Sequence, residues 1–137
     1  MKPMLRNVLA ILAGIVIGSV VNMAIITVSG SIIPPPAGVD LTTMEGLKAA
    51  MPLMEPKHFL LPFLAHALGT LVGAIVTVKL VLNSHQRFAL ILSGWFLLGG
   101  IINIALLPSP LWFSLVDLLL AYIPFGYLGY WLAKPNK

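Results

Sequence analysis

The sequence predicts an all-α membrane protein in which four transmembrane helices form a bundle. The first observation is composition: 59% of the 137 residues are hydrophobic and 9% are charged, whereas a soluble domain carries about a quarter charged residues. The second is length, because four apolar runs (about 5–28, 58–80, 87–107 and 111–133) reach the roughly 20 residues that cross a bilayer. We expect one membrane domain over 1–137, with lipid on most of its surface.

The first apolar run follows Lys2 and Arg6, as the core of a secretory signal would. A signal core has only about 7–15 residues, so this longer run predicts an uncleaved transmembrane helix. Gly14 and Gly18 are four residues apart, and Asn22 continues their stripe. Small residues at this spacing let helices approach closely, so this face is expected to pack against another helix.

Residues 29–57 form the only long polar connection. Three consecutive prolines, Pro34 to Pro36, cannot continue a helix. Asp40 is a candidate N-cap for a short amphipathic helix over about 41–51. The pattern fits a helix that lies on the membrane surface or covers the bundle, and it fits an ordered loop without lipid contact equally well.

The second run contains a stripe of small residues at spacing four: Ala65, Gly69, Gly73 and Thr77. This stripe, with Gly99 in the third run, completes the set of predicted helix-packing positions. Two prolines are predicted to bend helices, since proline removes a backbone hydrogen bond. Pro62 would bend the second span and Pro124 the middle of the fourth.

Charge predicts the orientation of the spans. One side carries six cations and no acid: Lys2, Arg6, Lys79, Arg87, Lys134 and Lys137. The other side mixes two cations with three acids: Lys48, Lys57, Asp40, Glu45 and Glu55. The positive-inside rule therefore places both termini in the cytoplasm and 29–57 outside. In its general look the chain resembles small four-helix bacterial membrane proteins, which implies the inner (cytoplasmic) membrane.

The first and third spans align without a gap at an offset of 81 residues. Arg6 then meets Arg87 and Asn22 meets Asn103, among five identities in 21 positions. The second and fourth spans align more loosely, with His66 opposite Tyr122. Either the chain contains two helical hairpins in a parallel repeat, or membrane hairpins merely share basic ends and glycine stripes.

Four polar residues interrupt the apolar spans at a similar depth. Helical rise places His66, Asp117, Asn22 and Asn103 within about 6–12 Å of the outer ends of their spans. Thr70 and Ser114 lie one turn from His66 and Asp117. A buried Asp costs about 2.5–3.5 kcal/mol near the bilayer centre. We therefore expect an outward-facing polar cluster that handles a proton or a small polar solute.

Structural explanations of the same residues stay open. Intramembrane Asn often ties helices together, and a His–Asp bond can be structural. The tyrosines Tyr122, Tyr127 and Tyr130 are expected to pack. We predict no metal site, because two strong ligands are too few, and no cofactor.

Three classes of function remain: a transporter, channel-like or ligand-binding bundle; a non-catalytic accessory subunit of a membrane complex; and an intramembrane enzyme with a His–Asp pair. The enzyme ranks last because no nucleophile or third partner for the His–Asp pair is evident. Common catalytic motifs are also absent, and the chain has no cysteine. The scattered cations argue against nucleic-acid binding. Four spans enclose little volume, so we expect a homo-oligomer or a membrane-protein partner.

Overall fold

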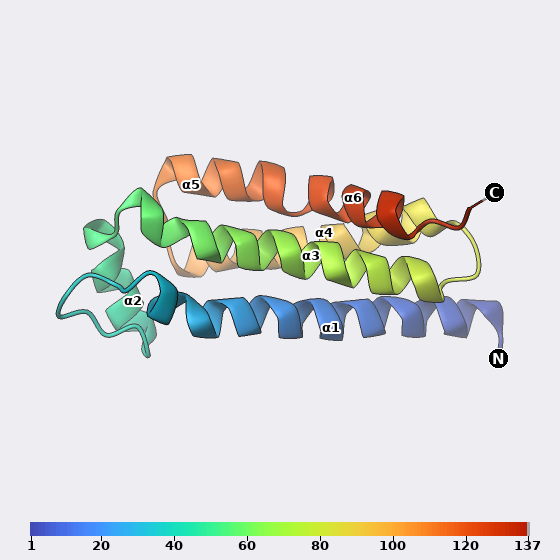
Figure 1. The fold of residues 1–137 in the computed structure, drawn as a ribbon, viewed down its shortest axis with the longest axis horizontal. Helices are drawn as coiled ribbons and strands as arrows, with labels where there is room; N and C mark the ends of the chain where they lie inside the picture. The colour runs from blue at the N-terminus through green and yellow to red at the C-terminus, as the bar shows by residue number, and fades with distance from the viewer. Residues whose placement is uncertain (137) are drawn as a thin grey trace.

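The computed structural model describes residues 1–136, which contain helices and no strand. Four helical segments run side by side: α1 (Pro3–Ile32), α3 (Leu60–Leu80), α4 (His85–Leu106) and a fourth segment in three parts (Figure 1). That fourth segment comprises α5 (Leu111–Val116), a π-helical turn (Asp117–Ala121) and α6 (Ile123–Ala133). Both termini lie at one end of the bundle, called here the terminal end. The connection from α1 to α3 lies at the other, the loop end (Figure 1).

Four helices are long and apolar enough to cross a membrane: Pro3–Ile32, Pro56–Leu80, His85–Leu106 and Leu111–Ala133. These agree with the four expected spans to within a few residues at each end. Large apolar side chains point away from the bundle; Val16, Trp95 and Leu119 are 61%, 57% and 67% exposed. Such a surface suits lipid and is compatible with a membrane location.

Helices α1 and α3 pack along the two predicted glycine stripes. A Cβ on Gly73 would lie 2.7 Å from the carbonyl oxygen of Gly14, and one on Gly69 would lie 2.8 Å from that of Gly18. Neither contact leaves room for a side chain, so glycine lets the two backbones touch. The Thr77 hydroxyl adds a hydrogen bond to the Ala10 carbonyl at 3.3 Å. The stripes are therefore used within one chain.

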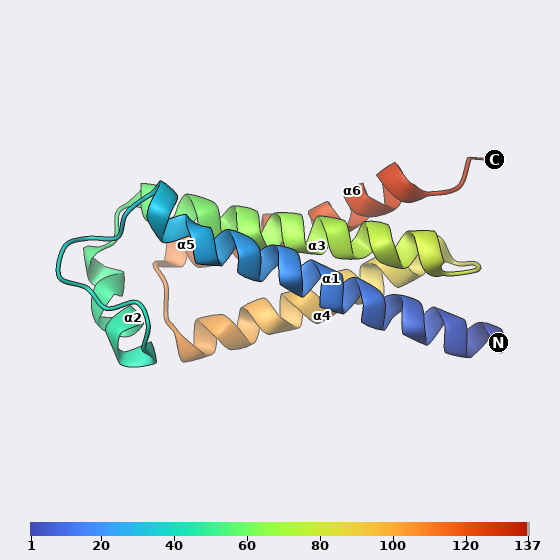
Figure 2. The same ribbon diagram turned by 60° about the horizontal axis from the view of Figure 1, so that its bottom comes forward.

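Gly99 does not pack as expected. A Cβ there would meet no heavy atom within 4 Å, whereas one on the neighbouring Gly100 would lie 2.7 Å from Cζ of Tyr122. Gly100 is thus the glycine of α4 that lies against the fourth segment. Figure 2 shows α4 crossing beneath α1 and α3 on its way to the loop end.

The loop end carries the short helix α2 (Met44–Ala50), with 3₁₀ turns at Met51–Leu53 and Pro56–Phe59. The prediction that Asp40 caps this helix was wrong. The Thr43 hydroxyl accepts from the Gly46 N–H at 3.0 Å and is the cap. Asp40 instead accepts from the hydroxyl and the N–H of Thr42. These two bonds lower the pKa of Asp40 below its usual value.

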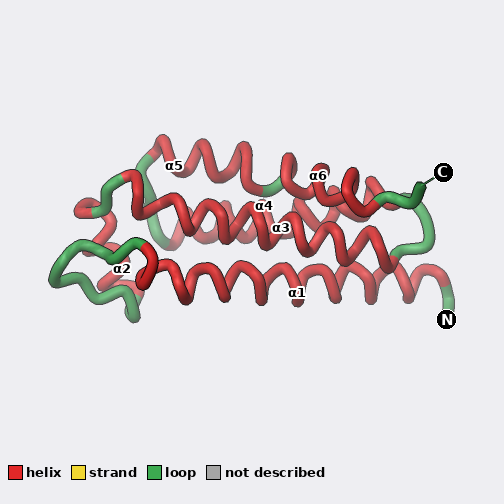
Figure 3. Tube along the Cα trace, viewed as in Figure 1, coloured by secondary structure: helices red, strands yellow, loops and turns green. Residues whose placement is uncertain are grey.

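Only one of the two prolines expected to bend a span interrupts a helix. Helix α3 begins at Leu60, so Pro62 lies in its first turn, where a missing N–H removes no hydrogen bond. Pro124 lies at the start of α6, directly after the π turn, so the fourth span is broken rather than gently kinked. Figure 3 shows this break as a loop-coloured gap between α5 and α6.

Candidate functional site

A cavity of about 710 Å³ lies in the loop-end half of the bundle. Its walls come from the last part of α1, the first part of α3, the last part of α4 and the fourth segment as far as Tyr122. Residues of the long connection cover its mouth: Pro35, Leu41, Leu47, Met51 and Met54. Of these residues, Leu47 belongs to the short helix α2, so the helix contributes to the lining of the cavity.

His66, Asp117 and Tyr122 form a connected polar group in this cavity. Nδ1 of His66 lies 2.7 Å from Oδ1 of Asp117, and the hydroxyl of Tyr122 donates to the other oxygen, Oδ2, at 3.1 Å. The rings of His66 and Tyr122 stack with their centroids 5.8 Å apart. Asp117 is 2% exposed, so both carboxyl oxygens depend on these neighbours in place of water.

The π turn explains how Tyr122 reaches Asp117. Five residues along a regular α-helix rotate a side chain by about 140°, toward another face. A π turn is wider and returns residues at spacing five to nearly the same face. Pro124 favours this turn, because its ring cannot fit the regular helix and it donates no hydrogen bond to the preceding turn.

The tautomer of His66 decides which atom donates in its bond to Asp117. An ionised carboxylate only accepts hydrogen bonds, so with Asp117 ionised the shared proton lies on Nδ1 of His66. The other ring nitrogen, Nε2, bonds to no group within residues 1–136, and the ring lines the cavity. In the neutral imidazole this nitrogen is an acceptor, and it can also take up a proton. Asp117 thus orients and stabilises a base that is open to the cavity.

Asn22 and Asn103 line the same cavity from α1 and α4. Within the described chain their amides bond to no protein group, unlike that of Asn7, whose Oδ1 accepts from the Leu82 N–H at 3.1 Å. The expectation that Asn22 and Asn103 tie helices together by hydrogen bonds therefore does not hold within this chain. Asn22 is half-buried and Asn103 is exposed, so both amides are accessible to a solute or to water.

Thr70 and Ser114 have local partners. The Thr70 hydroxyl donates to the carbonyl of His66 at 2.8 Å, within α3, and this residue lines the cavity. Ser114 shares a hydrogen bond of 2.7 Å with Ser109 in the turn before α5. The cavity thus gathers His66, Asp117, Asn22, Asn103 and Thr70, whereas Ser114 supports its rim.

Sequence reasoning missed Tyr122 as a site residue. An α-helical reading of the fourth span turns it away from Asp117, and the chain gave no separate sign of a π turn. Pro124, seven residues after Asp117, was the available clue, because proline inside a span disturbs the preceding turn.

Metal binding lacks a donor set in the part of the chain that the structure describes, where no three His, Cys, Asp or Glu residues come together. His58 also lines the cavity, but both its ring nitrogens are engaged. Nδ1 accepts from the Glu55 N–H at 2.8 Å and Nε2 donates to the Pro34 carbonyl at 3.0 Å.

Comparisons with protein-family models, curated proteins and solved structures found no match to this chain. The function must therefore be argued from the cavity itself.

Proposed function

We propose that this chain is a small membrane protein that binds a polar solute in its loop-end cavity and exchanges a proton with it through His66. The bond of 2.7 Å between His66 and Asp117 carries the proposal. It leaves Nε2 of His66 as a base without a protein partner, in a cavity lined also by Asn22 and Asn103. An intramembrane ionisable pair beside a cavity marks a functional site.

The site suits reversible proton exchange. When Nε2 takes a proton, the imidazolium lies against the Asp117 carboxylate, so the positive charge is compensated where it forms. The Tyr122 hydroxyl holds the second carboxylate oxygen in both states. Binding and proton uptake thus occur at one place, as a proton-linked carrier requires.

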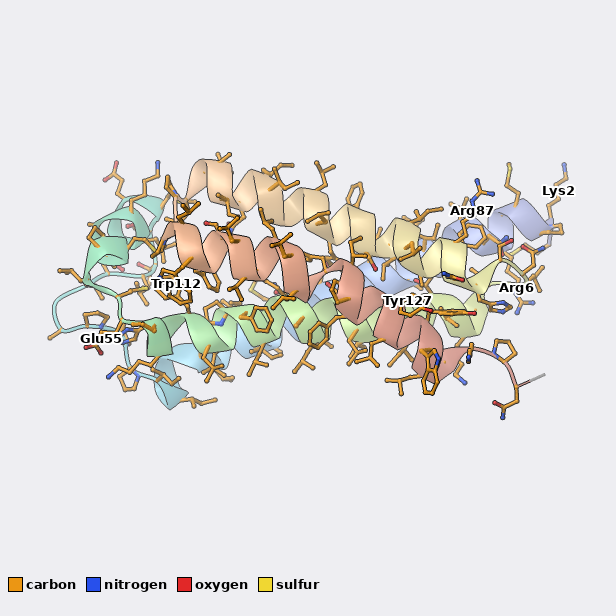
Figure 4. The ribbon with its side chains drawn as sticks, turned by 90° about the horizontal axis from the view of Figure 1, so that it is seen from above. Lys2, Arg6, Glu55, Arg87, Trp112 and Tyr127 are labelled. Atoms are coloured by element: carbon orange, nitrogen blue, oxygen red, sulfur yellow. The ribbon has the colours of Figure 1, made fainter. Side chains whose placement is uncertain are left out.

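We also propose an orientation for the bundle in a bacterial inner membrane. Both termini lie in the cytoplasm, and the cavity opens to the outside. Figure 4 shows Lys2, Arg6 and Arg87 at the terminal end, with Glu55 and Trp112 at the loop end. Lys137, also counted in the charge pattern, lies outside the described residues. The clustering of cations at the terminal end supports this orientation through the positive-inside rule.

We also propose that the chain contains two helical hairpins related by a parallel repeat. Asn22 with Asn103 and His66 with Tyr122 are the pairs that the repeat would make equivalent. All four line one cavity, and His66 stacks on Tyr122. Two related hairpins facing a common cavity would produce this arrangement.

Transport would require a change of conformation or a second copy of the chain. In the terminal-end half, Ala74, Val78, Ala89 and Leu92 are at most 1% exposed and form a packed core. Packed interiors do not conduct solutes. We propose that a homo-oligomer or an inward-open state completes the path.

A thermal-stability screen of the purified protein in mild detergent tests the binding function. Small solutes of neutral, cationic and anionic character are added singly, because a ligand of the folded state raises the unfolding temperature. A true hit should disappear in His66→Gln and persist in Gly94→Ala, which alters a helix position with open space around it.

Hits that are equally strong in His66→Gln would remove this residue from the site. If a second protein co-purifies with this chain in a stoichiometric amount and no solute raises the unfolding temperature, the accessory-subunit alternative is favoured instead.

A further inference from the structure

The cavity carries a single acid and no basic side chain that is permanently charged. Among the described residues that line it, Asp117 is the only carboxyl group, and none is Lys or Arg. The remaining titratable lining groups are His58, His66 and Tyr122. His58 must be neutral to accept from Glu55 as it does. When Asp117 is ionised and His66 is also neutral, the cavity has one net negative charge.

This charge is shielded poorly. Asp117 is 2% exposed, and in low dielectric a charge acts more strongly on its neighbours than it does in water. An anionic solute would meet repulsion and no compensating Lys or Arg. A cationic solute on the cavity side of the His66 ring would be attracted by the Asp117 carboxylate on the other side of that ring. The electrostatics of the cavity therefore select cations over anions.

The free polar atoms point to the same kind of ligand. Neutral His66 presents Nε2 as an acceptor, and the amides of Asn22 and Asn103 can turn their oxygens inward. An ammonium group carries up to three donors, enough to satisfy three such acceptors. A bound ammonium would thus fill the hydrogen-bonding capacity that these side chains leave unused.

The rest of the lining is apolar and aromatic. Phe59, Phe96 and Phe113 line the cavity, and Met51 and Met54 lie among its mouth residues. Aromatic faces attract cations, and methionine adapts to apolar bodies of varied shape. At about 710 Å³ the cavity lies within the range of small-molecule sites, roughly 300–1,000 Å³. It can therefore hold an apolar body behind a polar head.

We propose that the ligand class of this cavity is the hydrophobic amine, an ammonium group on an apolar or aromatic body, bound in competition with a proton on His66. The inference rests on the proposed binding function and names its ligand class. The competition follows from charge, because a proton on Nε2 cancels the negative charge and occupies the acceptor. The titratable groups that contact His66 from the elements around it are Asp117, at 2.7 Å, and Tyr122, whose ring stacks on the imidazole. His58 also lines the cavity.

Three probes that share one body test the head-group requirement: phenylbutylammonium, phenylbutanol and phenylbutanoate. Each is titrated by calorimetry into the detergent-purified protein at mildly alkaline pH, with an empty-micelle blank. We expect the ammonium to bind at least about tenfold more tightly than the alcohol and the carboxylate to show no saturable binding. Asp117→Asn should remove this preference, and Gly94→Ala should keep it.

The pH profile of the unaltered protein provides a test that needs no variant. Exclusive binding of one proton or one amine predicts that amine affinity falls on acidification, by at most about tenfold per pH unit. An amine affinity that is independent of pH would overturn the competition.

The outcomes separate this inference from the function on which it rests. If the alcohol or the carboxylate binds as tightly as the ammonium, and the binding is lost in His66→Gln, the ligand class is wrong and the binding function stands. If none of the three binds, the amine class is overturned, and the solute screen alone decides the binding function.

Discussion

The hydroxyl of Tyr122 donates to Oδ2 of Asp117 at 3.1 Å although the two residues are five positions apart in one transmembrane segment. The π turn at Asp117–Ala121 makes this contact possible. π turns inside α-helices occur frequently at functional sites. In this chain the turn serves a defined purpose, because it gives a buried carboxyl group a second donor opposite His66.

Replacement of Tyr122 by phenylalanine should destabilise the protein by about 1 to 3 kcal/mol, since a buried carboxylate oxygen loses its donor. Detergent-induced unfolding followed by circular dichroism measures the change. Tyr127→Phe is the matched control, because the Tyr127 side chain is 47% exposed and lies away from the cavity. Equal stability of the two variants would show that the Tyr122 hydroxyl does not support Asp117.

Asp117→Asn should invert the tautomer of neutral His66. With Asp117 ionised, its carboxylate accepts from Nδ1–H in the native chain. An asparagine amide can instead donate to Nδ1, which would move the proton to Nε2. Nitrogen-15 NMR of labelled histidine distinguishes the two tautomers, and His66→Gln identifies the signal among the three histidines. An unchanged Nδ1–H tautomer in Asp117→Asn would contradict the proton assignment.

Gly73→Ala should weaken the contact between α1 and α3. The added methyl group would lie 2.7 Å from the Gly14 carbonyl oxygen, so the helices must separate at a cost of about 1 to 3 kcal/mol. Gly94→Ala adds the same methyl group where nothing lies within 4 Å and should leave stability unchanged. Thermal unfolding in detergent compares the two variants. Similar midpoints would mean that the glycine contact contributes little.

Replacement of His58 by alanine should loosen the connection between α1 and α3. Nδ1 of His58 accepts from the Glu55 N–H at 2.8 Å, and Nε2 donates to the Pro34 carbonyl at 3.0 Å. The imidazole thus joins two distant parts of the connection, and alanine removes both bonds.

Amide hydrogen exchange at Glu55, measured at one pH, follows this loosening. Protection should be lower in His58→Ala than in the native chain, because the Glu55 N–H loses its acceptor. Equal protection in the two chains would show that His58 does not fasten the connection.

Several parts of the architecture could be predicted because they depend on local composition. The four spans follow from apolar length, and the contact between α1 and α3 follows from Gly14, Gly18, Gly69 and Gly73, where close approach needs the absence of a side chain. Depth along the helices also placed His66 and Asp117 at one level. That level is where the structure joins them.

Other details depended on choices between near-equal local alternatives. Asp40 and Thr43 are both good helix caps, and the backbone path after the prolines selected Thr43. Gly99 and Gly100 are adjacent, and the rotation of α4 about its axis decided which one meets Tyr122. Adjacent residues of an α-helix point about 100° apart, so only one of the two glycines can face the fourth segment. The rotation of α4 that selects it is not specified by the sequence pattern.

The amino-acid sequence alone determined that this chain has four apolar spans, cations gathered at one end and a few polar residues at one depth, because length, charge and helical rise are properties of the chain itself. Only the tertiary structure decided that these polar residues meet. The π turn rotates Tyr122 toward Asp117, and packing of α3 against the fourth segment brings His66 to the same carboxyl group. Contacts between distant segments depend on helix rotation and packing, which no single segment encodes.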